Sequence, residues 1–173
     1  MLNVRNIPIH IGYYLSGFAD GEGSFNISFR PRPDYQTKWK ISACFNISQK
    51  DKVILALFKK HLKCGTLRKR EDGIWYYEVN NLTSIIENVL PFFKKFGFLS
   101  AKKKRDFQVF TKIVMMMKEN KHLTKEGIKT ILNLRNEMNE GGKRKYSDEE
   151  ILKAYEESSE TIRQIPSTDV TGE

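Results

Sequence analysis

The sequence predicts an α+β fold in which a helix followed by two strands occurs twice and further helices complete the chain. Polar and apolar residues alternate over two pairs of short segments, the pattern of half-buried strands in an antiparallel sheet. Apolar residues three and four positions apart mark the helices, above all the one that follows the first strand pair and the long one after the second. The 173 residues suffice for one domain with a substantial core.

The first helix is predicted over about residues 9–20. Pro8 suits its first turn, where a missing N–H costs nothing. One face of this helix is nearly bare, because Gly12 and Ser16 are four positions apart and Gly17 follows directly. Such a face allows another helix to approach backbone to backbone.

An open turn follows the first helix. Gly21 and Gly23 flank Glu22, which leaves its carboxylate unshielded. The alternative is that Glu22 is an acidic residue without a function on a Gly-rich turn. A calcium loop is a second alternative, but the ligand pattern of an EF-hand is absent.

The first two strands are predicted over about residues 24–32 and 38–48. In each strand one alternating set is apolar and takes the core side, and the other set is polar. The polar face of the first strand carries Ser24, Asn26, Ser28, Arg30 and Arg32, and that of the second carries Lys38, Lys40, Ser42, Cys44 and Asn46.

Asp51 is predicted to cap a helix that runs through Leu62. A second strand pair follows at about 65–70 and 74–79, joined by a turn whose Asp-Gly sequence favours a hairpin. The third strand adds Arg68 and Arg70 to the polar face. Trp75 and Tyr77 alternate with Tyr76, and the residues leave open which side of the fourth strand is buried.

Helices are predicted for the rest of the chain. One spans about 83–96 and is broken at Pro91, and a long one runs from Ser100 to about Glu119. Thr124 and Ser147 are predicted to be the N-caps of two further helices. We divide the chain into a body, residues 1–146, and an acidic C-terminal helix and tail, residues 147–173.

The charge of the chain is unevenly placed and points to a polyanionic partner. The formal net charge is +9, and residues 147–173 hold 8 acidic and 2 basic side chains, so residues 1–146 carry +15. A body this basic implies nucleic acid as partner. No apolar run is long enough to span a membrane, and the start of the chain lacks the form of a signal peptide. The two cysteines, Cys44 and Cys64, do not have the spacing of metal ligands. We therefore expect reduced thiols and an intracellular protein without membrane contact.

The polar face of the sheet suits DNA. Arginine matches the two major-groove acceptors of guanine, and asparagine matches the acceptor and donor of adenine. Same-face side chains repeat about every 6.8 Å along a strand, close to two base-pair steps, so a nine-residue strand follows roughly nine base pairs. A solvated face is the alternative, but it would mix signs, whereas the two long strands carry no acid there.

Residues 15–23, LSGFADGEG, together with the strand after them, resemble the defining motif of the LAGLIDADG homing endonucleases. Ser16 and Gly21 stand for alanine, and Glu22 stands for the final aspartate. The resemblance covers about residues 9–146 and implies the αββαββα homing endonuclease fold, with an antiparallel DNA-binding sheet and extra C-terminal helices. Because the motif occurs once, the resemblance also implies a homodimer whose interface is the first helix, with Gly12, Tyr13, Ser16 and Gly17.

The resemblance also implies a catalytic set. Divalent metal assists phosphodiester hydrolysis, and Mg²⁺ or Mn²⁺ prefers carboxylate and carbonyl ligands. In the family the final acid of the motif and the carbonyl before it bind the metal, which here are Glu22 and Gly21. The residues that order water and stabilise charge correspond to Gln49 and Lys102. A further basic residue of the family corresponds to Val53, so Lys50 or Lys52 would have to replace it.

The same resemblance places Trp75 and Tyr77 toward DNA. Backbone phosphates would be contacted by basic residues outside the sheet. These residues are Lys104, Lys143, Arg144 and Lys145. Asp20 is expected to cap or support the end of the first helix instead of binding metal.

The function implied is a site-specific double-strand DNA endonuclease of the intron-homing type. It would hydrolyse both strands across the minor groove of a long near-palindromic site and leave 3′ overhangs. An intron maturase that holds its host intron RNA, or another non-cleaving nucleic-acid-binding protein, is the alternative. The compartment would be an organelle (chloroplast or mitochondrion) or a prokaryotic cytoplasm, between which the sequence does not decide.

Overall fold

The computed structural model describes residues 1–35, 37–139 and 144–163, and it confirms the predicted α+β order. The first α-helices and the strands are α1 (Ile9–Glu22), β1 (Ser24–Pro31), β2 (Trp39–Gln49), α2 (Lys52–Leu62), β3 (Thr66–Lys69) and β4 (Trp75–Val79). The rest are α3 (Leu82–Ser84), the π-turn η2 (Ile85–Val89), α4 (Leu90–Phe96), α5 (Ala101–Lys118), α6 (Lys125–Asn136) and α7 (Asp148–Arg163), with short 3₁₀ turns at Val4–Asn6 and Lys121–Leu123.

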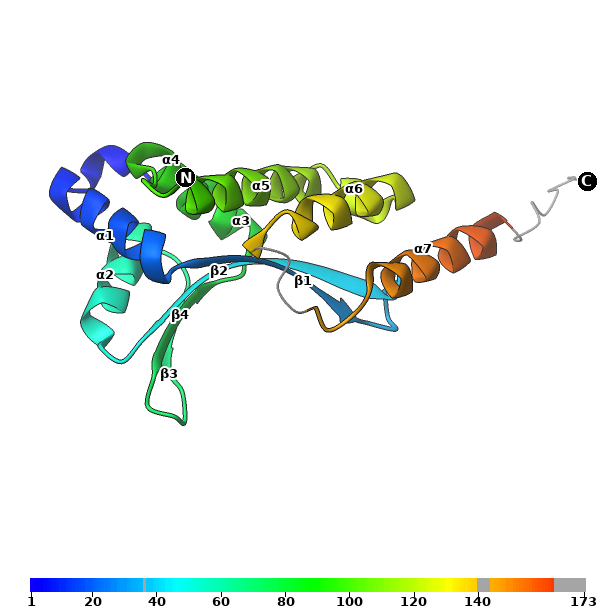
Figure 1. Cartoon of the computed structure of the whole chain (residues 1–173), viewed down its shortest axis with the longest axis horizontal. Coiled ribbons are helices and arrows are strands. Elements are labelled where there is room, and N and C mark those ends of the chain that lie inside the picture. Colours follow the sequence, from blue (N-terminus) through cyan, green and yellow to red (C-terminus); the bar gives the residue numbers. More distant parts are fainter. Residues whose placement is uncertain (36, 140–143, 164–173) are drawn as a thin grey trace, which may run out of the picture.

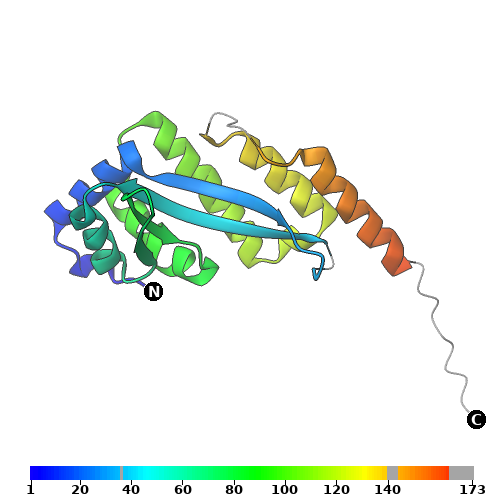
Figure 2. The ribbon, with the colours of Figure 1, turned by 90° about the horizontal axis from the view of Figure 1, so that it is seen from below.

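The four strands form one antiparallel sheet in the order β1-β2-β4-β3. Ser24 pairs with Asn46 and Arg30 with Lys40, so the polar residues of the two long strands share one face. Helices α1, α4, α5 and α6 lie on the other face (Figure 1). Seen from below, the long strands lie in front of these helices and one face of the sheet is uncovered (Figure 2).

Aromatic side chains fill the space between the sheet and its helices. The Phe25 ring on β1 lies 5.1 Å from Phe45 on β2, 5.6 Å from Phe93 on α4 and 5.0 Å from Phe110 on α5. All four side chains are almost completely buried. The core therefore fixes the start of β1, and with it the turn that precedes this strand.

The segment predicted as a broken helix over 83–96 is a continuous helical path with a π-turn in it. Pro91 lies in the first turn of α4, directly after η2. Proline cannot donate to the carbonyl one turn earlier, and its ring crowds that carbonyl. In the structure the Glu87 carbonyl accepts a hydrogen bond from the Leu2 N–H instead, at 2.7 Å. The wider turn and the N-terminal residues thus accommodate the proline without ending the helix.

The first half of α7 packs on the body. Ile151 and Tyr155 are buried, and the Tyr155 hydroxyl donates to the His122 carbonyl at 3.3 Å. At its start Asp148 forms an ion pair of 2.7 Å with the buried Arg135 of α6. Contacts therefore cross the boundary that the sequence placed at residue 147. No helix of the described chain is long and apolar enough to cross a membrane.

Candidate active site and nucleic-acid interface

Glu22 is the last residue of α1 and is exposed at the turn into β1. Gly23 ends the helix by donating its N–H to the Ala19 carbonyl at 2.9 Å. A Cβ on Gly23 would lie 2.7 Å from that same carbonyl oxygen, so this close approach needs glycine. A Cβ on Gly21, in contrast, would meet open space. The turn therefore presents one carboxylate and leaves room around it.

One chain supplies only part of a metal site. Among the described residues, no three His, Cys, Asp or Glu side chains gather to hold a metal ion. Glu22 and the Gly21 carbonyl are oxygen donors of the kind that Mg²⁺ takes, and they fit such an ion as two of its six ligands. The remaining positions would have to come from water, substrate phosphate or a second chain.

Asp20 ties the end of α1 to the start of α5. Its carboxylate accepts hydrogen bonds from the N–H groups of Leu99 (3.1 Å) and Ser100 (2.9 Å) and from the Ser100 hydroxyl. Ser100 in turn caps α5 by accepting from the Lys103 N–H at 3.2 Å. Partial burial raises the pKa of Asp20, but the hydrogen bonds from Ser100 and Leu99 outweigh it and hold the pKa below its ordinary value. Asp20 therefore supports a helix terminus, but this terminus is the start of α5 and not the end of the first helix, where the sequence analysis placed its role.

Lys103 is the basic residue that reaches the motif turn. Its Nζ donates to the Gly23 carbonyl, one residue after Glu22. Burial lowers its pKa, although the carboxylates of Asp106, Asp20 and Glu22 attract its charge. Lys102, which the family resemblance selected, is exposed on α5 beside Arg105. The sequence analysis missed Lys103, although it lies four and seven positions before the inward Phe107 and Phe110 and therefore shares their helix face.

Gln49 ends β2 at the same end of the sheet as Glu22. The register pairs Ser24 with Asn46, so three further residues bring Gln49 level with the motif turn. Its Oε1 accepts from the Lys50 N–H at 3.1 Å. Of the two possible replacements for the further basic residue, Lys52 lies over the Trp75 ring at 4.6 Å, and Lys50 is exposed.

The uncovered sheet face carries most of the residues predicted to contact nucleic acid. Cross-strand pairing sets Asn26 beside Cys44 and Ser28 beside Ser42, and the Asn26 amide donates to the Ser24 hydroxyl at 3.0 Å. In the β1–β2 hairpin Arg32 forms an ion pair with Asp34, and in the β3–β4 hairpin Arg70 forms an ion pair with Asp72. Eleven of the residues predicted to contact DNA from this face and its rims are at least partly exposed: Ser24, Asn26, Ser28, Arg30, Arg32, Lys38, Lys40, Ser42, Asn46, Arg68 and Arg70.

The placement of Tyr77 toward DNA is wrong. Tyr77 pairs with Ile47 of β2, is fully buried, and donates its hydroxyl to the Cys64 carbonyl at 3.0 Å. Trp75 points to the same side and packs at the edge of the core. Tyr76 takes the open face instead, with the Arg68 guanidinium 5.3 Å from its ring. The sheet buries the tyrosine that faces α2, a choice that alternation alone does not make.

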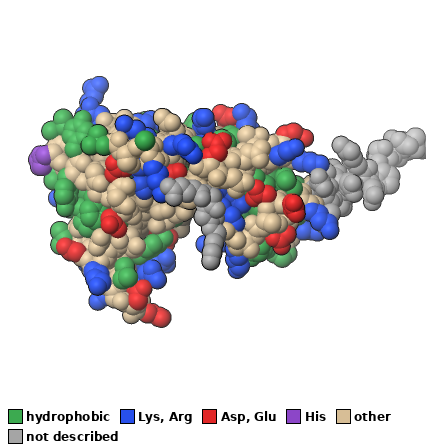
Figure 3. Space-filling view, viewed as in Figure 1, with side chains coloured by type: hydrophobic (Ala, Val, Ile, Leu, Met, Phe, Trp, Pro, Cys, Tyr) green, Lys and Arg blue, Asp and Glu red, His purple; other side chains and the backbone are tan. Residues whose placement is uncertain are grey.

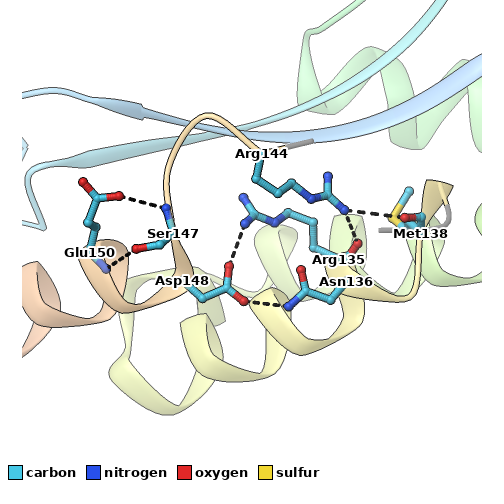
Figure 4. A network of polar contacts seen from close by, with 7 residues as sticks. All are labelled: Arg135, Asn136, Met138, Arg144, Ser147, Asp148 and Glu150. Atoms are coloured by element: carbon cyan, nitrogen blue, oxygen red, sulfur yellow. Dashed lines mark hydrogen bonds and ion pairs between the residues drawn. The ribbon is translucent and has the colours of Figure 1, made fainter. Parts of the chain in front are cut away.

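The role predicted for Arg144 also changes. Its guanidinium donates to the Arg135 carbonyl at 2.8 Å and to the Met138 carbonyl at 3.5 Å (Figure 4). It therefore caps the end of α6, and one terminal nitrogen of its guanidinium is committed within the chain. Lys145 is exposed, as is Lys104 on α5, and their contact with DNA phosphates stays a prediction. Lys143 lies outside the described residues.

The bare face of α1 is covered by the same chain. A Cβ on Gly12 would fall within the Phe96 ring, and the Ser16 hydroxyl donates to the Gly97 carbonyl. The expectation that these two residues form a dimer interface is therefore wrong, because α4 occupies their face. The exposed side of α1 carries Ile9, Tyr13 and Gly17, and hydrophobic side chains gather at this end of the molecule (Figure 3).

Known proteins share both this sequence and this fold. "Probable intron-encoded endonuclease 2" of Neurospora crassa is 33% identical over 149 residues, which cover 79% of this chain and 33% of that protein. "Homing endonuclease I-ApeII" of Aeropyrum pernix is 28% identical over 148 residues, covering 81% of this chain and 87% of that protein. The chain thus spans about a third of the length of the first of these relatives.

Two solved structures match most of the fold. The homing endonuclease I-TnaI superposes with a TM-score of 0.71 and 30% identity, over 85% of this chain and 97% of that one. The archaeal intron-encoded homing endonuclease I-Vdi141I, solved in complex with DNA, superposes with a TM-score of 0.77 and 26% identity, over 87% and 96%. A family model described as LAGLIDADG endonuclease matches residues 15–114, more than half of the chain. With its αββαββ order, its motif turn and this match, the chain belongs to the LAGLIDADG endonuclease family.

Proposed function

We propose that this chain is a site-specific endonuclease that cuts both strands of a long near-palindromic DNA site and acts as a homodimer. The observation that carries the proposal is the exposed carboxylate of Glu22 beside the Gly23 carbonyl that Lys103 contacts, at the end of an uncovered sheet face rich in Arg, Lys, Asn and Ser. The named relatives are intron-encoded and homing endonucleases, and one similar structure is a DNA complex, which supports DNA as substrate.

In this proposal Glu22 and the Gly21 carbonyl hold Mg²⁺ or Mn²⁺, which supplies charge stabilisation at the scissile phosphate and an activated water. Lys103, in place of Lys102, brings a positive charge to the negative charge that develops on the phosphate. Gln49 orients water at the same end of the sheet. The sheet face reads base edges, and Lys104 and Lys145 contact phosphates, which positions the duplex without specifying sequence.

A second copy would complete the site. Two chains joined through the exposed side of α1 would bring two motif turns together, so each Glu22 would cut one strand. Cleavage across the narrow minor groove would leave 3′ overhangs. Two carboxylates this close repel each other unless cations lie between them, which is a reason for such a site to bind metal. We expect the protein to work where its DNA lies, in an organelle or a prokaryotic cytoplasm.

The first test is a cleavage selection on a randomised double-stranded DNA library, with and without Mg²⁺. We expect a long near-palindromic site that is cut only with metal.

Glu22→Gln should abolish cutting and leave specific binding, because it removes the anion but little of the shape. Metal-dependent cutting by that variant would contradict the role of Glu22. No cut product, together with binding to structured intron RNA, would favour the maturase.

A further inference from the structure

Asn139 joins two elements beside the motif turn. Its side-chain amide donates to the Phe25 carbonyl on β1 at 3.0 Å, and its backbone N–H donates to Asp106 Oδ1 on α5 at 3.1 Å. Phe25 lies two residues after Gly23, whose carbonyl accepts from Lys103. Asp106 lies about one helical turn after Lys103, on the same side of α5. Asn139 thus connects the strand that continues from the motif with the helix that carries Lys103.

The local structure is built for these bonds. Asn139 has a φ of 51°, in the left-handed region that asparagine tolerates better than most residues. Asp106 is only 5% exposed, and a carboxylate this buried needs hydrogen bonds or charges to satisfy it. It finds the Asn139 N–H and the attraction of Lys103. The unusual backbone conformation and the buried charge are therefore both matched by partners at this junction.

We propose that Asn139 is a positioning residue for Lys103, an inference that rests on the proposed nuclease function. The buried apolar face of α5 holds this helix against the sheet, and Asp20 with Ser100 ties the start of α5 to α1. Asn139 adds a polar link beside Lys103. Its amide ties residue 139 to β1, and its backbone N–H bonds the Asp106 carboxylate, which attracts the Lys103 ammonium near the motif turn. Asn139 lies beyond residues 15–114, so the part of the chain that follows the family match contributes to the geometry of the site.

Asn139→Gly tests this role, because glycine keeps the left-handed backbone and the N–H that bonds Asp106 and removes only the amide that ties residue 139 to the Phe25 carbonyl of β1. Asn120→Gly is the matched control, since Asn120 has a φ of 57° and is exposed in the turn after α5. We expect Asn139→Gly to lower the single-turnover cleavage rate by about 10- to 100-fold, the scale of a small misplacement at a reacting centre. DNA affinity without divalent metal should match that of the control, and the double-mutant cycle below separates any loss of stability. A rate equal to that of Asn120→Gly would overturn the proposal.

A double-mutant cycle shows whether the effect passes through Lys103. In a Lys103→Met background, Asn139→Gly should lower the residual rate no further, because the residue that it positions is gone. A general loss of stability would instead lower both backgrounds by the same factor. Equal fold losses in the two backgrounds would therefore contradict the positioning role.

A measurement that needs no cleavage separates this inference from the proposed function. Amine acylation of the folded protein, read by mass spectrometry, should label the half-buried Lys103 slowly and the exposed Lys104 quickly. Asn139→Gly should raise labelling of Lys103 several-fold and leave Lys104 unchanged. Unchanged labelling of Lys103 contradicts the positioning role even if the protein cuts DNA. If the wild-type protein cuts no DNA, but Asn139→Gly still raises the labelling of Lys103, the result contradicts only the nuclease proposal.

Discussion

Lys102 and Lys103 are neighbours in one run of basic residues, yet about 100° of helix rotation separates their side chains. That rotation brings Lys103 to the Gly23 carbonyl and leaves Lys102 on the exposed side of α5. Glu22 is set apart from Asp20 in a similar way. Asp20 is engaged by Leu99 and Ser100, whereas Glu22 stands at the exposed end of α1. Chemistry at this site is thus assigned by the direction of each side chain and not by residue type.

This difference predicts unequal effects of two equivalent substitutions. Lys103→Met should lower the cleavage rate by at least about 100-fold, the usual scale for loss of a group that stabilises transition-state charge. Lys102→Met should change the rate by less than about 10-fold, although it can weaken DNA binding at higher salt. Single-turnover kinetics at saturating DNA measure both. A larger loss in Lys102→Met would restore the assignment made from the family resemblance.

At the scale of elements, the site is a junction where one helix ends and another begins. The C-terminus of α1 meets the N-terminus of α5, and the carboxylate of Asp20 satisfies N–H groups that a helix start leaves without partners. The same logic explains the π-turn before Pro91, where the Leu2 N–H takes up the carbonyl that proline leaves open. Local backbone groups and their partners therefore determine how the helices are joined around the motif.

The lowered pKa of Asp20 makes a prediction about stability against pH. Because the pKa is lower in the folded than in the unfolded chain, the stability that Asp20 contributes is present above the unfolded value of about 3.9 and is lost as pH falls through the folded value. Asp20→Asn should therefore cost about 1 kcal/mol at pH 7, because it weakens hydrogen bonds to a charged but partly exposed carboxylate, and progressively less in acid. Denaturant unfolding from pH 7 to pH 3 checks this. A constant difference would show that Asp20 stays charged throughout or contributes nothing by charge.

In the whole molecule, one side of α1 packs within the chain and the other side is exposed. Gly12 and Ser16 let α4 approach within the chain, and Tyr13 and Gly17 lie on the exposed side that we propose as the dimer interface. The C-terminal helix α7 belongs to the same body, because the Arg135–Asp148 pair and Tyr155 dock its first half. A helix that is apolar on one side and small-faced on the other can serve the core and a partner at once.

The two glycines of α1 should respond oppositely to substitution. Gly17→Lys meets open space in one chain, so it should leave folding intact and convert a dimer to a monomer. Gly12→Ala should instead destabilise each chain by about 1–3 kcal/mol, because its methyl group overlaps the Phe96 ring. Sedimentation analysis and thermal unfolding distinguish the two effects. A Gly17→Lys protein that remains dimeric would place the interface elsewhere.

The α+β order and the motif turn can be predicted from the residues alone. Alternation of polar and apolar residues is a property of adjacent positions, and β1 and β2 needed nothing more to be predicted. Glu22 could be singled out because its flanking glycines are read directly from the chain. Three features could not be predicted in this way: Tyr77 faces the core, Lys103 reaches the turn, and α4 covers Gly12. Each of these depends on which element packs against which face, and that is set by long-range packing and not by local periodicity.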